Sequence, residues 1–380
     1  MRGNITRRGK SSWRLKFDAG VDGDGKRVIN YETIRGTKKQ AEAALSKRLN
    51  EVSEGRYVQP TTETVETYAR HWLENIAPVD RSPLTLARYH TLIEIHIIPG
   101  LGHVALKELD GKTIDAFYTD RRSKGKRYRG GLSSSTMGNL HRLLSLILKS
   151  AVKAKKISSS PIGDVQTKPK PKRNKIEVLN EGELAALLDH LRAGPLYLPA
   201  LVSAYTGLRR GEICGLRWRD LDLGKATLQV CQQVQNIGGE LVTLIPKTDR
   251  SRRTIRLPAS LPAALKAHRK DQAELRLQLG LGKDAADLVF TDALGRHLDP
   301  DAFSKSFAAE TAAVKRVTFH SLRHSHITHL LRNGVPVHIV SKRAGHANPS
   351  ITLNTYAHLL GGDDERAADV ADAMLRTILK

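Results

Sequence analysis

Cysteines and long apolar runs are both scarce in this sequence. Its 380 residues contain two cysteines, Cys214 and Cys231, which are too few for a disulfide framework and indicate a reduced, intracellular protein. The first residues are polar and basic and lack the apolar segment of a secretory signal peptide. The longest apolar stretches fall far short of the roughly 20 residues that a membrane-spanning helix needs. We therefore expect a cytoplasmic protein without a membrane segment.

Acidic residues are outnumbered as well. The sequence has 62 lysines and arginines against 39 aspartates and glutamates, which gives a formal net charge of +23 and an isoelectric point of about 10.1. Such an excess is typical of proteins that bind a polyanion, most often a nucleic acid. The alternatives are a basic protein kept soluble by its charge and one that binds a membrane surface, although no lipid-anchoring signal is present. The length favours two or three domains.

Residues 1–57 predict a small α+β domain with three strands and one helix. Apolar residues at 5, 13, 15 and 17 alternate with polar ones, as in half-buried strands, and residues 20–25 predict a turn. Thr37-Lys-Lys-Gln40 predicts a capping box at the start of a helix that runs to about Glu54. A basic sheet of this kind suits binding in a DNA groove, and a structural appendage is the alternative. Its candidate DNA contacts are Arg7, Arg8, Lys10, Arg14 and Lys16.

Residues 62–165 predict an all-helical domain. Ser82-Pro83 predicts a helix start, because a capping residue precedes a proline that suits the first helical position. We expect residues 98–102 (IPGLG) to break the chain and residues 134–154 to form a long amphipathic helix. The helix that starts at Pro83 should turn Leu84, Ala87, Leu92 and Ile95 inward. Such a domain suits a clamp on duplex DNA, with candidate contacts in a basic loop at Lys124, Lys126, Arg127 and Arg129.

Residues 166–175 predict a basic linker, because prolines stop helix formation and the lysines repel one another. The linker could lie along a phosphate backbone or be a solvated hinge, and the two interpretations are compatible. Its candidate DNA contacts are Lys168, Lys170, Lys172 and Arg173.

Residues 176–380 predict a mainly helical domain with a small antiparallel sheet. The expected strands cover 227–234, 241–245 and 253–257, with a turn at Gly238-Gly239 between the first two. The chain closes on an amphipathic helix that either folds back on its own domain or docks on a neighbouring copy. Gly280-Leu-Gly-Lys283 lacks the length and context of a nucleotide-binding loop, so we expect no ATP site.

Two segments of this last domain carry chemistry. One is Thr206-Gly-Leu-Arg-Arg-Gly-Glu212, and the other, Thr318 to Leu359, contains His320-x-x-Arg323, Gly345-His346 and Tyr356. Cleavage of a phosphodiester without a metal needs cations that clamp the non-bridging oxygens, a nucleophile, and an acid for the leaving oxygen. The planar guanidinium of arginine suits the clamp. A tyrosine beside cations and a base can attack, and its phosphate ester preserves the bond energy, so that resealing needs no ATP.

The histidines of the second segment also admit a metal site in principle. His-x-x-x-His spacing occurs in zinc sites, but the glutamate of His-Glu-x-x-His is missing and no cysteine is close in sequence. We therefore expect no metal and no other cofactor. His324 is expected to pack or hydrogen-bond behind the active site, and His329 and His358 to be structural.

The segments TGLRRGEICGLRW and HSLRHSHITHLLRNG…GH…TLNTYAH resemble the two catalytic boxes of tyrosine recombinases of the phage and integrative-element type. The resemblance covers essentially the whole chain. It implies an arm-type DNA-binding domain at residues 1–57, a helical, SAM-like core-binding domain at 62–165, and a catalytic domain with a C-terminal tail helix at 176–380. The implied fold is multidomain, with a small α+β N-terminal domain, an all-α domain and a mainly α catalytic domain.

The resemblance also implies roles for single residues. Arg209 and Arg323 would clamp the scissile phosphate, and Glu212 would orient the first of them. His320 would transfer a proton, His346 would hydrogen-bond the phosphate, and Tyr356 would attack it. Lys247 would protonate the leaving 5′-hydroxyl, with Lys225 as the alternative. Arg210 is expected to face solvent or the DNA backbone. In the absence of the motif, Glu212 would be expected to face Arg217 or Arg219.

The implied activity is site-specific recombination of a mobile element by a phage or bacterial protein. It would proceed through a 3′-phosphotyrosine intermediate and a Holliday junction, with four copies on double-stranded DNA that has core and arm sites. An excisionase and a host DNA-bending protein are possible further partners. The alternatives are a type IB topoisomerase-like enzyme and a non-enzymatic, architectural DNA-binding protein of the same fold.

Overall fold

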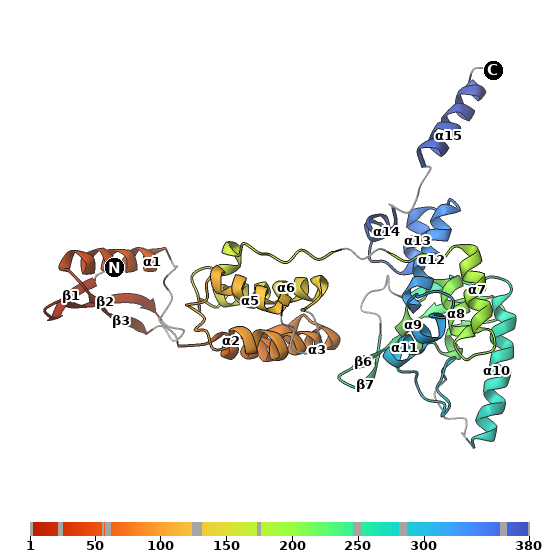
Figure 1. The fold of residues 1–380 in the computed structure, drawn as a ribbon, viewed down its shortest axis with the longest axis horizontal. Helices are drawn as coiled ribbons and strands as arrows, with labels where there is room; N and C mark the ends of the chain where they lie inside the picture. The colour runs from red at the N-terminus through yellow and green to blue at the C-terminus, as the bar shows by residue number, and fades with distance from the viewer. Residues whose placement is uncertain are drawn as a thin grey trace. The chain divides into compact units, whose positions relative to one another are not determined.

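The computed structural model describes residues 3–21, 26–54, 57, 62–123, 131–172, 176–245, 252–280, 287–357 and 363–378. The chain forms two compact units, Met1–Arg173 and Asn174–Lys380 (Figure 1). Among the described helices, none is both long and apolar enough to cross a membrane.

The first unit begins with a three-stranded antiparallel sheet in the order β1-β2-β3, and α1 lies across one of its faces (Figure 1). Leu15 and Phe17 are buried against Ala41 and Leu45 of the helix, because alternate residues of a strand face the same side. The predicted sheet and helix are therefore confirmed, whereas residues 22–25 of the predicted turn lie outside the described residues. The elements are β1 (Gly3–Gly9), β2 (Ser12–Val21), β3 (Arg27–Arg35) and α1 (Lys38–Ser53).

The predicted capping box at the start of α1 is present. The amide of Gln40 donates to the Thr37 hydroxyl at 3.3 Å, and the Thr37 amide donates to the Gln40 side chain at 2.8 Å. These two bonds satisfy backbone groups that the first helical turn leaves without partners.

The rest of the first unit is helical, as predicted, and packs around a second hydrophobic core. The inward face expected for residues 134–154 is confirmed in α6, where Leu140, Leu143, Leu144, Ile147 and Leu148 are buried. The elements are α2 (Val65–His71), a π-helical turn (Trp72–Ile76), a 3-10 turn (Ala77–Val79), α3 (Pro83–Leu92), a second π-helical turn (Ile93–Ile97), α4 (Ile98–Leu101), α5 (Gly111–Ser123), α6 (Ser134–Lys153) and a 3-10 turn (Pro161–Asp164).

One expectation for the α3 region is confirmed and another is wrong. Helical structure ends at Leu101 of α4, inside the predicted break at residues 98–102. Ile95 does not face inward: it is 38 % exposed, whereas Ile93 and Ile97 are fully buried. The π-helical turn explains this difference, because its wider turn rotates the residues that follow away from the 3.6-residue period. Residue Ser82 does cap α3 as predicted.

The first half of the predicted linker lies against the helical region. The Asp115 carboxylate accepts the amides of Gln166 and Thr167 at 3.0 and 2.8 Å. Pro171 covers Gly138 so closely that a side-chain carbon at that glycine would approach the proline ring to about 2.4 Å. Residues 166–172 are thus anchored on α5 and α6, and residues 173–175 lie outside the described residues.

The second unit is mainly helical and contains two small sheets. Helices α8 and α12 lie side by side and belong to the main core, together with α7 and α11 (Figure 1). The helices are α7 (Glu181–Leu191), α8 (Tyr197–Thr206), α9 (Arg210–Cys214), α10 (Leu261–Gln278), α11 (Pro300–Thr311), α12 (Phe319–Arg332), α13 (Val337–Ala344), α14 (Pro349–Tyr356) and α15 (Asp363–Ile378).

The sheets differ from the predicted arrangement. The stretch 227–234 forms two strands instead of one, because it is interrupted at residues 231–232, where the Gln232 side chain donates to the Gly215 carbonyl at 2.8 Å. The predicted third strand, β8, pairs with β5, so that Val230 lies opposite Arg253. One sheet has the order β4-β5-β8 and the other is the hairpin β6-β7, with β4 (Leu221–Asp222), β5 (Thr227–Val230), β6 (Gln233–Ile237), β7 (Glu240–Leu244) and β8 (Arg253–Arg256).

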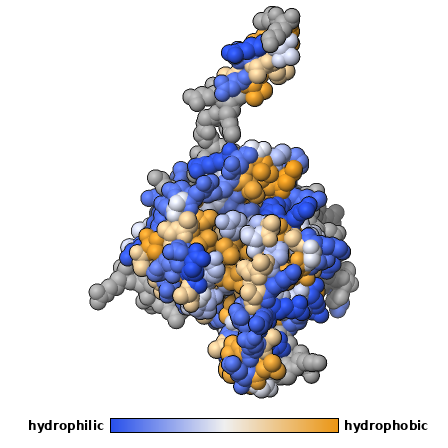
Figure 2. Space-filling view, turned by 90° about the vertical axis from the view of Figure 1, so that its right-hand side faces the viewer, coloured by the Kyte–Doolittle hydropathy of each residue, from blue (hydrophilic) through white to orange (hydrophobic). Residues whose placement is uncertain are grey.

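Helix α15 has the amphipathic sequence that was predicted. Its described side chains, residues 368–378, are exposed, and the apolar ones are uncovered on the helix surface (Figure 2). The exposed apolar residues include Val370, Met374, Leu375 and Ile378.

Candidate active site

The first predicted segment forms a sharp connection between α8 and α9. Gly207 has a left-handed backbone with φ of +71°, and a side-chain carbon there would lie 2.7 Å from the His326 ring, so the position requires glycine. Arg209 then stands directly before α9. The Glu212 carboxylate accepts both the Arg209 amide at 2.8 Å and its Nη1 at 2.9 Å. The carboxylate therefore holds both the backbone amide and the guanidinium group of Arg209.

Arg323 comes from the first half of α12 and is buried, with 2 % of its surface exposed. Its two terminal nitrogens donate to the Gly207 carbonyl at 2.6 Å and to the Ala344 carbonyl at 2.7 Å. Burial lowers the pKa of Arg323, and the charge of Arg209 lowers it further, whereas Glu212 raises it. The two carbonyls hold the guanidinium group in one orientation.

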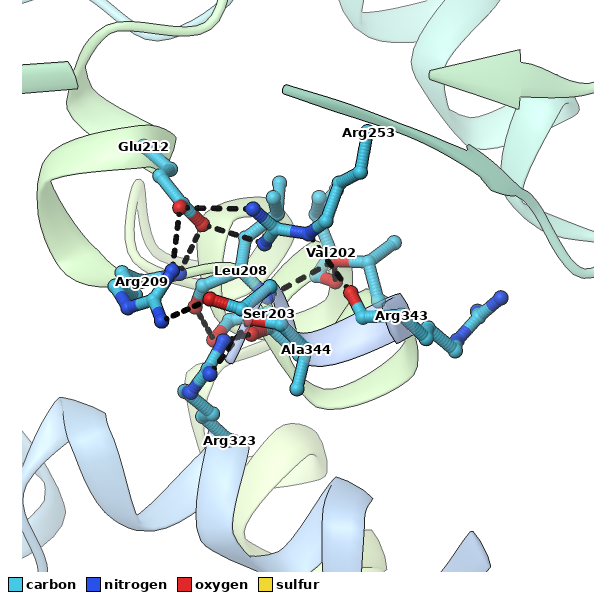
Figure 3. A network of polar contacts seen from close by, with 12 residues as sticks. Val202, Ser203, Leu208, Arg209, Glu212, Arg253, Arg323, Arg343 and Ala344 are labelled. Atoms are coloured by element: carbon cyan, nitrogen blue, oxygen red, sulfur yellow. Dashed lines mark hydrogen bonds and ion pairs between the residues drawn. The ribbon is translucent and has the colours of Figure 1, made fainter. Parts of the chain in front are cut away.

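The carboxyl end of α13 is the common support of three arginines (Figure 3). Arg253 Nε donates to the Arg343 carbonyl at 2.8 Å, Arg323 to Ala344, and Arg209 Nη2 to the Gly345 carbonyl at 2.8 Å. A helix carboxyl end carries partial negative charge and leaves carbonyls without intrahelical partners, so guanidinium groups are stabilised there. Three consecutive carbonyls thus position cations that come from three distant parts of the chain.

Arg253 was not among the residues predicted for the site. It forms a two-bond ion pair with Glu212, with Nη1 and Nη2 at 3.0 and 2.8 Å from the carboxylate oxygens, and its side chain is 2 % exposed. The alternation of strand 253–257 contained a signal, because Arg253 shares its face with the buried Ile255. Gly345 has φ of +66°, and a side-chain carbon there would lie 2.8 Å from Arg253 Nη1.

Glu212 is ionised within this network. Burial by itself would raise its pKa, but hydrogen bonds and charge from Arg253, with the charge of Arg209, lower it to about 2. The alternative partner Arg217 instead forms a two-bond ion pair with Asp220. Arg210 binds Asp301 and Ser304 of α11 at 3.0 Å each, and its side chain remains 38 % exposed to solvent.

The two predicted histidines flank the arginines. His320 lies in the first turn of α12 and is exposed, and its ring stands edge-on to His324 with 4.7 Å between the ring centres. His346 directly follows Gly345, and its Nδ1 lies 2.8 Å from the buried Thr352 hydroxyl. Enclosure by the protein lowers the pKa of His346, and the charges of Arg323 and Arg209 lower it further. The His346 ring is therefore neutral at neutral pH.

Tyr356 ends α14 and is buried, with 1 % of its surface exposed. Its hydroxyl lies 2.7 Å from His324 Nδ1. Burial raises the pKa of Tyr356 to about 12, although the charges of Arg323 and Arg209 oppose the rise. His324 therefore contacts the predicted nucleophile directly. His329 bonds the Leu179 carbonyl at 2.7 Å, while His358 lies outside the described residues.

Of the two lysine candidates for the leaving-group acid, the structure describes Lys225 but not Lys247. Lys247 belongs to residues 246–251, which lie outside the described residues. Lys225 lies in the turn between β4 and β5, with its side chain 83 % exposed and its ammonium 3.5 Å from the Asp222 carboxylate.

The predicted DNA contacts of the first unit occupy different positions. Arg14 and Lys16 lie over the exposed Tyr31 ring, at 5.3 and 5.9 Å from its centre. Arg7 instead lies over Trp13 and donates to two carbonyls of the β1–β2 turn. The remaining exposed candidates that the structure describes are Arg8, Lys10, Lys168, Lys170 and Lys172, whereas Lys124, Lys126, Arg127, Arg129 and Arg173 lie outside the described residues.

An open hollow of about 1100 Å³ adjoins the arginine network. The charged side chains that line it are basic, namely Arg217, Arg252, Arg253 and Lys342, and His338 and His346 line it as well. In the described part of the chain, no group of three histidine, cysteine, aspartate or glutamate side chains is arranged to hold a metal.

Comparisons with known proteins match this architecture. The model of the phage integrase family matches residues 177–361. A "Tyrosine recombinase XerC-like" protein of Caldanaerobacter subterraneus subsp. tengcongensis is 31 % identical over 378 residues, covering 94 % of this chain and 95 % of the relative. An integrase of Streptomyces ambofaciens is 24 % identical and covers 97 % of this chain and 94 % of its own length.

Solved structures share the fold. The Tn1549 transposon integrase, in complex with a circular intermediate DNA, has a TM-score of 0.67 at 20 % identity, over 81 % of this chain and 99 % of that one. A lambda integrase dimer bound to a core site has a TM-score of 0.57 at 16 % identity, over 93 % of this chain and 94 % of that one. The predicted multidomain fold is confirmed by these matches.

Proposed function

The chain belongs to the phage integrase family of tyrosine recombinases, and from this premise we propose that Tyr356 cleaves one DNA strand and holds its 3′ end as a phosphotyrosine. The observation that carries the proposal is the position of two arginines. Arg209 and Arg323 reach the same helix end from different segments, and their charges act on the Tyr356 hydroxyl. A phosphate bound by both would lie beside the nucleophile.

The arginines would act as a preorganised clamp. Each has hydrogen bonds to backbone carbonyls or to Glu212, so little reorganisation is needed when charge develops on the phosphate oxygens. Such donors typically contribute on the order of a hundred- to a thousandfold in rate each. The neutral His346, held by Thr352, would add a hydrogen bond to the phosphate, and His320, exposed at the start of α12, would take part in proton transfer.

The leaving 5′-oxygen needs a proton, and we assign that step to Lys247. In the sequence, Lys247 falls between β7 and β8, the strand that begins with Arg253. In the reverse reaction, a 5′-hydroxyl attacks the phosphotyrosine and reseals the strand. Because the ester preserves the energy of the phosphodiester, resealing needs no ATP. The two arginines would supply the charge stabilisation that a metal would otherwise give.

The assembly we propose has four copies on two core sites, with strand exchange in two steps through a Holliday junction. A lambda integrase tetramer bound to a Holliday junction has the same fold, with a TM-score of 0.56, which supports this arrangement. Residues 1–57 would bind arm sites and residues 62–165 the core duplex. The cationic hollow beside Arg253 would receive the DNA backbone. Helix α15 would dock within its own copy or on a neighbour, and an excisionase and a host DNA-bending protein are candidate partners.

A nicked suicide substrate with the core site tests the nucleophile. Wild-type protein should become covalently joined to the DNA, and Tyr356→Phe should form no adduct while binding the same DNA. Tyr205→Phe is a matched control, because this tyrosine is 45 % exposed at the end of α8. An adduct with Tyr356→Phe would contradict the proposal. If a monomer relaxes plasmids that lack the site, a topoisomerase is favoured. If the wild-type protein binds the DNA but forms no adduct, an architectural protein is favoured.

A further inference from the structure

We propose that His324 is the base that takes the proton from Tyr356 during attack on the phosphate, an inference that rests on the proposed function. The tyrosine hydroxyl and His324 Nδ1 lie 2.7 Å apart, which is hydrogen-bond distance for a proton transfer. The two side chains come from different helices, α14 and α12, whose packing sets this contact.

Attack requires an acceptor inside the site. Burial raises the pKa of Tyr356 to about 12, so its hydroxyl is protonated at neutral pH. With 1 % of the residue exposed, bulk water has little access to the hydroxyl. A phenol that keeps its proton is a poor nucleophile, so a neighbouring side chain must accept the proton as the new bond forms.

The surroundings of His324 keep it neutral and ready to accept a proton. His320 and Arg323 flank it on α12, and Tyr356 faces it from α14. Burial lowers the pKa of His324, and the charge of Arg323 lowers it further. The ring is therefore uncharged at neutral pH, and with hydrogen on Nε2 it offers the Nδ1 lone pair to the phenol.

The weak basicity of this imidazole determines when the proton is transferred. Complete transfer before attack would be strongly uphill, so the proton must move while the bond from the tyrosine oxygen to phosphorus forms. The bond between phosphorus and the 5′-oxygen breaks in the same displacement, and the proposed acid Lys247 supplies the proton that this oxygen takes. The imidazolium stands beside the negatively charged phosphate and returns its proton to the tyrosine when the strand is resealed.

His320 is less suited to this step. It is exposed, and the contact that the structure gives its ring is the edge-on one with His324. The two histidines are one helical turn apart and so face the site at different depths. His320 is thus available to the phosphate, and His324 to the nucleophile.

The test compares His324→Asn with His329→Asn in single-turnover cleavage. Asparagine places an oxygen near the position of Nδ1 and keeps an acceptor for the phenol, but it cannot take a proton. His329 is a matched control on the same helix, because its ring bonds a backbone carbonyl away from Tyr356. Loss of a general base typically costs a hundred- to ten-thousandfold, so we expect His324→Asn to slow cleavage at least about a hundredfold. His329→Asn should cleave within about threefold of wild type once thermal melting shows that it is folded.

A more acidic nucleophile distinguishes proton acceptance from a merely structural role. A fluorinated tyrosine placed at position 356 alone should recover most of the rate that His324→Asn loses, because its proton leaves more easily. It should not rescue Lys247→Ala, whose defect a 5′-phosphorothiolate leaving group should repair instead. Cleavage by His324→Asn within threefold of wild type, or a defect that the fluorotyrosine leaves unchanged, would overturn the inference. His324→Gln serves the same comparison if the asparagine variant does not fold.

The result also separates this inference from the function on which it rests. An adduct formed by Tyr356→Phe would contradict both the proposed function and the role of His324. Normal cleavage by His324→Asn, with no adduct from Tyr356→Phe, would contradict the role of His324 as the base and leave Tyr356 as the nucleophile.

Discussion

The N-terminal sheet and the candidate active site both gather positive charge, but they hold it in opposite ways. Arg14 and Lys16 lie over the ring of Tyr31 on a sheet face that is open to solvent. Arg323 and Arg253 have side chains about 2 % exposed, and backbone carbonyls and a carboxylate bind their nitrogens. The first arrangement leaves charge mobile, whereas the second fixes it.

This difference teaches what each region can do. Exposed cations keep rotamer freedom, so they can follow a phosphate backbone, and each contributes modestly and in a salt-dependent manner. Buried cations have lost that freedom during folding, and they present their charge to a phosphate without further ordering. Removal of one of them also leaves its partners buried and unpaired. Substitutions in the two regions should therefore differ in kind.

The largest effect is expected from Arg323→Lys, which retains the charge but not the geometry. The N–H donors of a lysine all sit on one nitrogen, so they cannot reproduce the two separate guanidinium nitrogens that reach the Gly207 and Ala344 carbonyls, nor bind phosphate with a planar pair of donors. We expect single-turnover cleavage to fall by about a hundred- to a thousandfold or more. Arg14→Lys, the matched change on the open sheet, should leave cleavage within about twofold. Similar losses of cleavage rate in the two variants would contradict the distinction between fixed and mobile charge.

A smaller effect on cleavage, but a large one on stability, is expected from Arg253→Met. Methionine fills similar space but leaves Glu212 with the half-exposed Arg209 as its partner. Breaking a buried pair from one side typically costs about 3–5 kcal/mol. The double variant with Glu212→Gln should be less destabilised than the sum of the two single variants, as measured by denaturant unfolding. Strict additivity would show that the pair does not act as a unit.

The same pair predicts a dependence of stability on pH. The folded state lowers the pKa of Glu212 to about 2 from an ordinary value of 4.5. The ion pair therefore stabilises the fold fully above about pH 4.5, and this contribution is lost as the pH falls towards 2. Glu212→Gln should lose less stability than wild type across that interval, and parallel curves for the two proteins would contradict the assignment.

Local features of the fold could be predicted, because their causes lie within a few residues. The capping box at Thr37 and the buried face of α6 follow from short-range hydrogen bonds and helical periodicity. The π-helical turn at Ile93–Ile97 could not be predicted, because it departs from the 3.6-residue helical period on which the prediction rests. The two motif segments marked the site, and the structure brings Arg209 and Arg323 to one helix end.

The network of hydrogen bonds and ion pairs around the motifs could not be predicted from the sequence. Arg253 reaches Glu212 across 41 residues and the Arg343 carbonyl across 90, so no local pattern links them. His324 was expected behind the site, and its bond to Tyr356 depends on how α12 and α14 pack. Long-range packing thus decides which of several similar arginines and histidines contact one another, whereas composition shows only that they are present.

The smallest effects are expected on the open sheet, where Arg14→Ala and Lys16→Ala sharpen the comparison from its other side. Each removes one mobile cation, so the slope of log affinity against log salt should fall by about 0.9 for each phosphate that the variant no longer neutralises. Titration of an arm-type duplex at several salt concentrations measures this slope. The free energy of unfolding should change by no more than about 0.5 kcal/mol, because neither cation binds a buried carbonyl or carboxylate in the part of the chain that the structure describes. A changed slope with unchanged stability would show that this charge acts on DNA and contributes little to the fold, whereas an unchanged slope would make the sheet a structural appendage.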